Sequence, residues 1–207
     1  MRLLVIGAGG HAKVVVDAAR CAGLTVAGVI GKPDDPATLL GIPVSRDASA
    51  VDADGFIVAI GDNAARARTF SAYRERGLEP ASVVHPSAVI AGGVTMGSGA
   101  FVAAGVVVNV DARIGANAIL NTGCTVDHDC VVGDHALIGP SASLCGGVEI
   151  GEGVLLGAGA SVTPGARIGA WSVVGAGAAV VDHLPADSVC VGVPARPLGR
   201  TGSGDAR

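Results

Sequence analysis

The chain has 207 residues and a formal net charge of -4, and its 14 Lys and Arg residues are scattered rather than gathered in a basic run. This balance argues against nucleic acid as a partner. Half of the residues are hydrophobic, only 2% are aromatic and 33 are glycine, so we expect a core of small and medium-sized aliphatic side chains between glycine-bearing turns. The five cysteines include no CxxC pair, which disfavours a disulfide framework or a zinc knuckle.

The first 80 residues alternate between aliphatic runs and segments with helical spacing. Residues 3–6 predict a strand that ends in a glycine turn and continues into a helix. We expect further strands at residues 25–30 and 55–61, with a loop over 31–44 between them and a helix over 64–77 after them. Such alternation predicts a small parallel sheet. The opening apolar stretch is too short to span a bilayer and has no small-residue cleavage site, so we expect a cytoplasmic protein without membrane insertion.

The glycine turn nearly matches a dinucleotide fingerprint, with Gly7, Gly9 and Ala12 in the three spaced positions. Backbone N–H groups and a helix N-terminus at such a turn suit a phosphate. A nicotinamide site would need an acidic residue near the end of the second strand, where the chain has Gly31 and Lys32. Hydride transfer is therefore disfavoured, and the alternative that these glycines only permit a tight turn stays open.

A period of six residues governs the chain from Ile90 onward. Every sixth residue is a large aliphatic one: Ile90, Met96, Val102, Val108, Ile114, Leu120, Val126, Val132, Ile138, Leu144, Ile150, Leu156, Val162, Ile168, Val174 and Val180. Four places later in each hexad the residue is small or medium-sized. Six residues is not a whole number of helical turns, which excludes a helix. The pattern predicts a chain that turns a corner every six residues, with Gly, Asn or Asp in the strained corner backbone.

Prolines mark the limits of the two parts. Two of them lie in residues 78–89, just before the first hexad, so we place the domain boundary at Pro80, with a Rossmann-like domain over 1–80 and a β-helix over 81–200. Further prolines in residues 182–198 break the repeat, and we expect this segment to leave the coil as a loop and a strand. Residues 201–207 are small and polar and are expected to be a disordered tail.

His128 is the candidate general base. A histidine can accept a proton from a reacting group near neutral pH. Asp127 and Asp129 flank His128. From its place in the hexad, we expect the His128 side chain to point outward, away from the packed interior. The alternative is a merely solvated surface histidine.

Several motifs together resemble the hexapeptide-repeat sugar O- and N-acetyltransferases. They are GAGGHAKVVVDAAR, VAIGDN, HPSAV, ILNTGCTVDHDCVVGD, GPSASLCGGVEIGEG and VGVPARPL, and the likeness covers nearly the whole chain. That family includes sialic acid O-acetyltransferases, UDP-N-acetylbacillosamine-pathway N-acetyltransferases and GDP-perosamine N-acetyltransferases, and the last type is the most similar.

The resemblance implies a small Rossmann-like α/β domain followed by a left-handed parallel β-helix, in which three hexads form a coil of eighteen residues. Residues 90–179 would then give five coils. Gly146, eighteen residues after His128, would lie directly above it, and a glycine there would leave space for a substrate. The resemblance also implies a cytoplasmic homotrimer, acetyl-CoA as co-substrate without a metal, and a nucleotide-linked amino sugar as acceptor. The amine would attack the thioester directly, without a covalent acyl-enzyme.

The resemblance also assigns roles to residues. His128 is the implied base, Asp129 its acidic neighbour, and Asn121 lies near the acceptor amine. The nucleotide would be held by Gly9, Gly10, His11, Gly61, Asp62 and Asn63. The coenzyme would be held near Gly146, Ala158, Ala176 and the position of Leu137.

Two departures from the family are visible. Leu137 stands where family members commonly have a histidine, while a histidine is found instead at His135. The paired acids that usually follow the second strand are displaced, as Asp34 and Asp35, by the insertion-like GKP. The identity of the nucleotide base is therefore not predicted.

Three other functions stay open. A sialic acid O-acetyltransferase would use the same base, since a histidine serves hydroxyl and amine alike. A carbonic-anhydrase-like metal enzyme would need three converging histidines, and His183 is poorly placed to be the third. A nucleotide-binding scaffold without catalysis is the third possibility. Cys124 and Cys130 occupy inward positions and are rejected as nucleophiles, whereas Cys145 is not dismissed as firmly.

Overall fold

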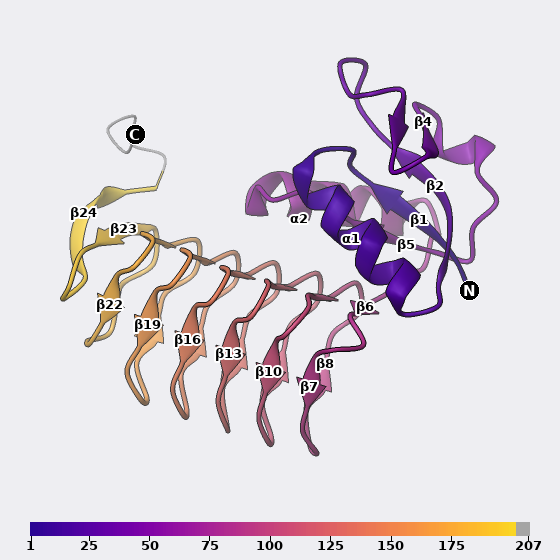
Figure 1. Ribbon diagram of the computed structural model, residues 1–207. Coiled ribbons are helices and arrows are strands. Elements are labelled where there is room, and N and C mark those ends of the chain that lie inside the picture. The colour runs from indigo at the N-terminus through magenta and orange to yellow at the C-terminus, as the bar shows by residue number, and fades with distance from the viewer. Residues whose placement is uncertain (202–207) are drawn as a thin grey trace.

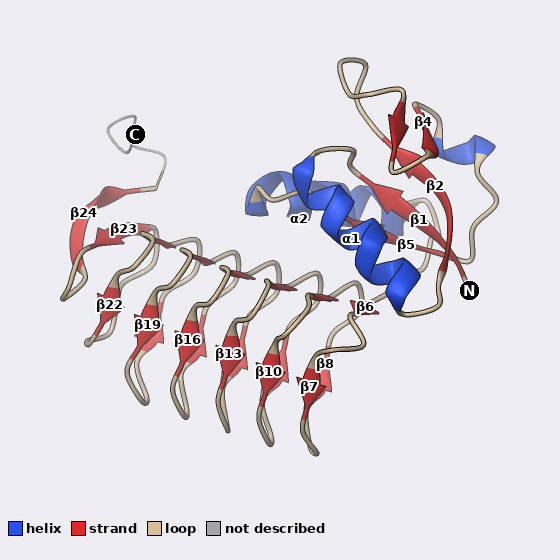
Figure 2. Cartoon of the chain, in the orientation of Figure 1, coloured by secondary structure: helices blue, strands red, loops and turns tan. Residues whose placement is uncertain are grey.

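The computed structural model describes residues 1–201. It has two parts, an N-terminal α/β domain and a parallel β-helix whose coils follow one another toward the C-terminus (Figure 1). Figure 2 shows that both long helices belong to the N-terminal part. The predicted fold is confirmed. The tail prediction lies outside the described residues, except for Thr201.

The N-terminal domain contains the predicted strand–helix alternation. Its main elements are β1 Arg2–Ile6, α1 Gly10–Cys21, β2 Thr25–Ile30, β5 Gly55–Val58 and α2 Asn63–Glu75. The strand order is β3-β4-β2-β1-β5, and β1 pairs with β2 and β5 in parallel. The central strand β1 is buried from Leu3 to Ile6, because a parallel strand covered on both faces needs a continuous apolar run.

The expected loop over 31–44 is partly a hairpin. Residues β3 Thr38–Leu39 and β4 Ile42–Ser45 pair with each other antiparallel, and β4 adds to the edge of the sheet beside β2. A 3-10 turn at Ala48–Ala50 follows. The two-residue β3 is too short to give an alternating pattern, so periodicity did not indicate it.

The β-helix has three faces, each a sheet of parallel two-residue strands, to which face 3 adds the longer β23 and the antiparallel β24 at its end. Face 1 consists of β7 Val89–Ile90, β10 Val107–Val108, β13 Thr125–Val126, β16 Ser143–Leu144, β19 Ser161–Val162 and β22 Ala179–Val180. Face 2 consists of β8 Thr95–Met96, β11 Arg113–Ile114, β14 Val131–Val132, β17 Glu149–Ile150 and β20 Arg167–Ile168. Face 3 consists of β6 Val83–Val84, β9 Phe101–Val102, β12 Ile119–Leu120, β15 Leu137–Ile138, β18 Leu155–Leu156, β21 Val173–Val174, β23 Ser188–Val191 and β24 Arg196–Arg200.

Strands that stack on one face are eighteen residues apart, as the resemblance implied. Val89 pairs with Val107, and Val107 pairs with Thr125. The large aliphatic residue of each hexad points into the shaft and is buried, except in the first coil, where Ile90 and Met96 are partly exposed. The first coil has no coil beneath it, so its inward side chains are covered from one side only.

The corners carry the predicted strain. Every sixth residue from 93 to 177 has a positive φ, and most of these residues are Gly, Asp or Asn. The exceptions are His135, Ser141 and Trp171, which occupy the left-handed region at a cost that Gly avoids. We call the turns between face 1 and face 2 corner 1–2, those between faces 2 and 3 corner 2–3, and those between faces 3 and 1 corner 3–1.

The C-terminal segment differs from the expectation that it leaves the coil. Leu184 bridges to Ile168, and β23 then pairs in parallel with β21, so both extend existing faces. Val173 pairs with Val189, which shortens this last coil by two residues. Only β24 turns back, antiparallel to β23. The three prolines of this segment lie outside the paired residues of face 2 and face 3 that continue the coil, so they do not interrupt its ladder.

The two parts share one core. The inner side of α1, with Val15 and Val16, joins the same buried cluster as Val83 and Phe101 of face 3. The helix α2 lies on the other side of the N-terminal sheet, where Phe70 packs with Phe56. In the part of the chain described, neither helix is long and apolar enough to cross a membrane.

Candidate active site

His128 lies at corner 1–2, between β13 and β14, and its side chain is 57% exposed. Its Nδ1 is 2.8 Å from Oδ2 of Asp129. Asp129 occupies the left-handed corner position with φ 59°, and this backbone conformation turns its carboxylate back toward the ring. On the other side, Oδ1 of Asp127 accepts hydrogen bonds from the His128 backbone N–H and from Nδ2 of Asn109, both at 2.8 Å.

This arrangement leaves one ring nitrogen of His128 free to act. A carboxylate can only accept, so the bond to Asp129 assigns the proton to Nδ1 and the lone pair to Nε2. The hydrogen bond to Asp129, with the charge of Asp127, raises the pKa of His128. The ring is therefore a stronger base than an isolated histidine, and its basic atom faces away from the shaft.

Gly146 lies directly above the ring, as the eighteen-residue repeat predicted. A Cβ at this position would be 2.6 Å from both Cε1 and Nε2 of His128. Any side chain would therefore press on the nitrogen that carries the lone pair. Glycine keeps the space beside Nε2 open.

Asn121 does not approach His128 within one chain. It lies at corner 3–1, one hexad before, so the two residues flank opposite edges of face 1. Its Oδ1 accepts from the backbone N–H of Thr122 at 2.9 Å. Among the described residues no hydrogen bond joins Asn121 to His128, Asp127 or Asp129.

The N-terminal domain contains a cavity of about 690 Å³ at the carboxyl ends of β1, β2 and β5. It is lined by Ile6, Gly7, Ala8, Gly9, Gly10, His11, Ile30, Gly31, Lys32, Asp35, Ala59, Ile60, Gly61, Ala65, Arg68, Thr69 and Tyr73. Four of the six residues predicted to hold the nucleotide are among them. This is the edge at which ligands bind in open α/β sheets.

The glycine turn opens into this cavity. The helix α1 begins at Gly10, and its N-cap residue Gly9 supplies no side-chain cap, so first-turn N–H groups are available to a ligand. A Cβ at Gly9 or Gly10 would meet nothing within 4 Å. Packing inside the chain therefore does not require glycine here, which favours the functional interpretation of the turn over the purely structural one.

His11 lies on the cavity wall nearest the β-helix. Its ring meets the ring of Phe101 edge to face, with centroids 5.4 Å apart. Burial, with a smaller contribution from the charge of Arg66, lowers the pKa of His11 to about 4. The ring is therefore neutral at pH 7. Its Nε2 is buried without a hydrogen-bond partner.

The other two predicted nucleotide residues point elsewhere. Asp62 caps α2, with its Oδ1 accepting from the backbone N–H of Ala65 at 2.7 Å. Asn63 is buried, and its Nδ2 donates to the carbonyls of Gly153 and Val154 in the β-helix. Neither residue lines the cavity.

Lys32 and Asp35 also line the cavity, although no contact with the nucleotide was predicted for them. Oδ2 of Asp35 accepts from the backbone N–H of Lys32 at 2.6 Å, which folds the insertion-like segment into a turn. Asp34 is not among the lining residues. The position of this segment directly after β2 was the available signal.

The four positions predicted for the coenzyme fall on three parts of the β-helix. Ala158 and Ala176 are exposed and stacked on consecutive turns of corner 3–1. Gly146 is on corner 1–2, and Leu137 is on β15 of face 3, partly buried against the core. One chain therefore does not bring these positions together.

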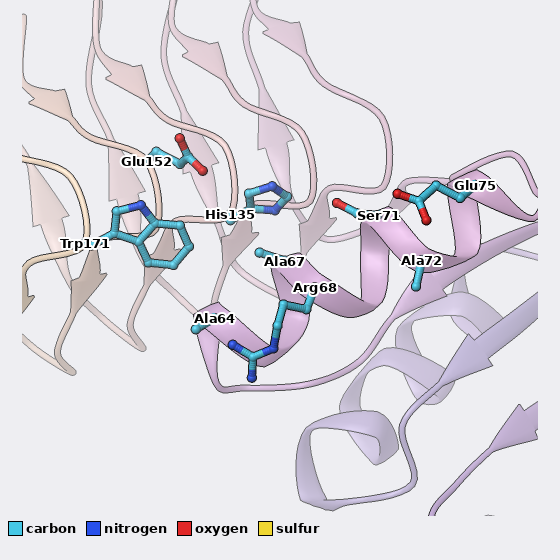
Figure 3. A pocket seen from close by; sticks show the side chains of 9 residues that line it. All are labelled: Ala64, Ala67, Arg68, Ser71, Ala72, Glu75, His135, Glu152 and Trp171. Carbon is cyan, nitrogen blue, oxygen red and sulfur yellow. The ribbon is translucent and has the colours of Figure 1, made fainter. Parts of the chain in front are cut away.

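A second hollow lies between α2 and corner 2–3. Figure 3 shows its lining side chains, which are Ala64, Ala67, Arg68, Ser71, Ala72, Glu75, His135, Glu152 and Trp171. Burial lowers the pKa of His135, and its Nδ1 is 2.8 Å from Nδ2 of Asn117. His135 is thus part of the contact between the two domains, on a different corner from His128.

The two cysteines rejected as nucleophiles, Cys124 and Cys130, are buried. Burial raises the pKa of Cys124 to about 12 and also raises that of Cys130, so both are protonated at neutral pH. Cys145 is partly exposed. Within residues 1–201 no three His, Cys, Asp or Glu side chains are close enough to hold a metal ion.

Comparison with known proteins identifies the family. The family model for the PglD N-terminal domain matches residues 2–73, and the model for the bacterial transferase hexapeptide matches residues 147–181. A mutant perosamine N-acetyltransferase from Caulobacter crescentus, solved with CoA and GDP-perosamine, is 42% identical over 96% of this chain and 97% of its own, with a TM-score of 0.92. The chain belongs to the hexapeptide-repeat sugar acetyltransferases. It is an acetyl-CoA-dependent enzyme of this family.

Two further structures are similar over almost their whole length. The acetyltransferase domain of PglB from Neisseria gonorrhoeae, in complex with acetyl coenzyme A, is 32% identical over 95% of this chain and 98% of its own, with a TM-score of 0.89. WeeI from Acinetobacter baumannii is 27% identical over 96% of this chain and 100% of its own, with a TM-score of 0.81. A comparison with curated proteins found no significant match.

Proposed function

We propose that this enzyme transfers the acetyl group of acetyl-CoA to the amine of a nucleotide-linked 4-amino sugar, with His128 as the general base. The observation that carries the proposal is the His128 site, in which Asp129 holds Nδ1 and Gly146 keeps Nε2 open. The complex of the Caulobacter crescentus relative with GDP-perosamine supports this substrate class.

The chemistry follows from the positions of the protons. Nε2 of His128 accepts a proton from the amine as the nitrogen attacks the thioester carbonyl. The C–N bond forms, the C–S bond breaks, and the sulfur of coenzyme A leaves and is protonated. Asp127 and Asp129 stabilise the imidazolium that develops, as the raised pKa of His128 indicates.

The active site needs two copies of the chain. The nucleotide cavity belongs to the domain that packs on face 3, where His11 meets Phe101. Corner 1–2, with His128, is the edge opposite face 3, so the body of the β-helix separates them within one chain. A substrate held in the cavity of one chain therefore reacts at His128 of another, in the homotrimer that the family resemblance implies.

Three of the four predicted coenzyme positions fit the same arrangement, while Leu137 lies on face 3. Ala158 and Ala176 form a smooth exposed column on corner 3–1, which suits an extended pantetheine arm. Gly146 and His128 are on corner 1–2. A coenzyme lying between corner 3–1 of one chain and corner 1–2 of its neighbour would contact all of these residues, and it would bring Asn121 of one chain near His128 of the other.

The test is thiol release from acetyl-CoA by the wild-type protein and by His128→Ala, with UDP-, GDP- and dTDP-linked 4-amino sugars and free sialic acid. We expect turnover with one nucleotide amino sugar and a loss of at least about tenfold in the variant. Activity on sialic acid alone would assign an O-acetyltransferase instead. Equal activity of His128→Ala and wild type would refute the role of the base.

A further inference from the structure

The contact between the two domains is apolar where α1 meets face 3 but polar where α2 meets corner 2–3. Five polar or charged residues are buried in the described chain, and three of them, Asn63, Arg66 and Asn117, lie where α2 meets corner 2–3. A buried polar group is costly unless it is hydrogen-bonded. Apolar side chains alone would hold the domains together without this cost. The polar groups here therefore indicate that the orientation of one domain relative to the other has to be fixed.

Arg66 is fully buried and donates all of its hydrogen bonds to backbone carbonyls. Nη1 donates to the carbonyls of Ile60 and Gly61 at 3.0 and 3.3 Å. Nε donates to the carbonyl of Asn117 at 3.1 Å. Nη2 donates to the carbonyls of His135 and Ala136 at 2.6 and 3.4 Å. Arginine has five N–H donors in a fixed plane, and this set of acceptors matches them in number.

The acceptors belong to the wall of the nucleotide cavity and to the β-helix, whose relative position matters for the proposed reaction. Ile60 and Gly61 form the wall of the nucleotide cavity that leads from β5 into α2. His135 and Ala136 belong to the same coil as His128, one corner further along the chain. Arg66 thus connects the cavity wall directly to the β-helix.

Two other side chains of α2 contact the coils on either side of those bound by Arg66. Asn63 donates to the carbonyls of Gly153 and Val154, and Phe70 fills the space that a Cβ at Gly99 would need. Residues 63, 66 and 70 share one face of the helix and advance by about 4.5 and 6 Å, comparable to the ~4.8 Å between coils. The wide guanidinium spans two coils, so three side chains of α2 meet four consecutive coils.

Among residues 1–201, no carboxylate accepts a hydrogen bond from Arg66 in the seam between α2 and corner 2–3. Burial lowers the pKa of Arg66 to about 10, with the charge of Asp62 opposing the shift, so the group stays protonated at neutral pH. A buried cation held only by oriented carbonyls is stable in a narrow range of geometries. A small rotation of the N-terminal domain would break several of these bonds together.

We propose that Arg66 is a positioning residue, which fixes the nucleotide cavity relative to the β-helix so that a bound sugar reaches His128 of a neighbouring copy. The inference rests on the proposed function for its catalytic readout. Arg66 itself does not line the cavity, and its effect on the reaction passes through the Ile60–Gly61 turn.

The experiment compares Arg66→Lys and Arg66→Met with Arg20→Met. Arg20 is an exposed arginine on α1 that donates to one backbone carbonyl, that of Leu40, at 3.0 Å. Lysine has at most three donors and no planar fork, so it cannot replace the five bonds. Both Arg66 variants are expected to raise KM for the nucleotide amino sugar at least tenfold, while KM for acetyl-CoA stays within twofold of wild type.

Hydrogen exchange supplies a readout that does not depend on turnover. Amides of α2 and of residues 133–136 are expected to exchange at least tenfold faster in Arg66→Lys, while those of β16 and β19 on face 1 are unchanged. Arg20→Met should match wild type in both measurements. Unchanged exchange and unchanged KM values in Arg66→Lys would overturn the proposal, and so would an equal rise in both KM values, which would indicate general destabilisation. If wild type acetylates no sugar, the proposed function fails, while the exchange data still decide the role of Arg66.

Discussion

Gly146→Ala tests the geometry around His128 with a single methyl group. The added Cβ would lie 2.6 Å from Cε1 and Nε2 of the ring. Two non-bonded heavy atoms ordinarily come no closer than about 3.4 Å. The ring must therefore move by roughly 1 Å, and a displacement of that size in a catalytic group costs on the order of 100-fold in rate. The backbone of Gly146 is outside the left-handed region, so alanine brings no backbone strain.

The assay is steady-state thiol release together with a melting curve. Gly92→Ala is the matched control, because Gly92 is at the same corner three coils earlier and a Cβ there would meet nothing within 4 Å. We expect kcat to fall about 100-fold in Gly146→Ala, with Tm within about 2 °C of wild type, and to stay unchanged in Gly92→Ala. A Gly146→Ala enzyme with wild-type kcat would show that the free space beside Nε2 is not used, and would refute the assignment of that nitrogen as the base.

Three further predictions follow from the same contacts. Asp129→Asn keeps a residue that tolerates the left-handed backbone but removes the main cause of the raised pKa of His128. The acid limb of the pH profile of kcat/KM should therefore move to lower pH. An unmoved limb would show that this limb does not report the titration of His128. Gly153 has φ 64°, and a Cβ there would press on the Trp171 indole, so Gly153→Ala should lower the free energy of unfolding by about 2 kcal/mol. Gly165 has φ 69° but open space around it, so Gly165→Ala should lower it by less. Equal losses of the two variants in chemical denaturation would contradict this. Cys145→Ala should keep kcat within about twofold, and a loss of tenfold or more would restore this thiol as a candidate nucleophile.

The β-helix could be predicted from the sequence because its determinants are local and periodic. Each coil repeats the same inward pair and the same corner residue, so reading one residue in six recovers the core. The stacking of Gly146 over His128 follows from the eighteen-residue coil that the family resemblance implies. The same six-residue period places His135 at a left-handed corner, although most of the corner residues are Gly, Asp or Asn.

The nucleotide cavity was predicted in part. Gly9, Gly10, His11 and Gly61 line it, because a glycine turn between a strand and a helix has one common geometry. The side chain of Asn63 is committed to the β-helix instead. A role for Asn63 and Asp62 in nucleotide binding stays a prediction, and their side-chain contacts give it no support.

By itself the sequence determined the two building blocks, because the hydrophobic period specifies which face of each strand, helix or coil is buried. Only the tertiary structure decided how the blocks meet. The seam around Arg66 joins residues 51 to 70 positions apart through backbone carbonyls, and every residue presents a carbonyl, so no residue type in the sequence marks the acceptors. The separation of the cavity from His128 by the body of the β-helix has the same origin, since it depends on which face the N-terminal domain covers and not on any local pattern.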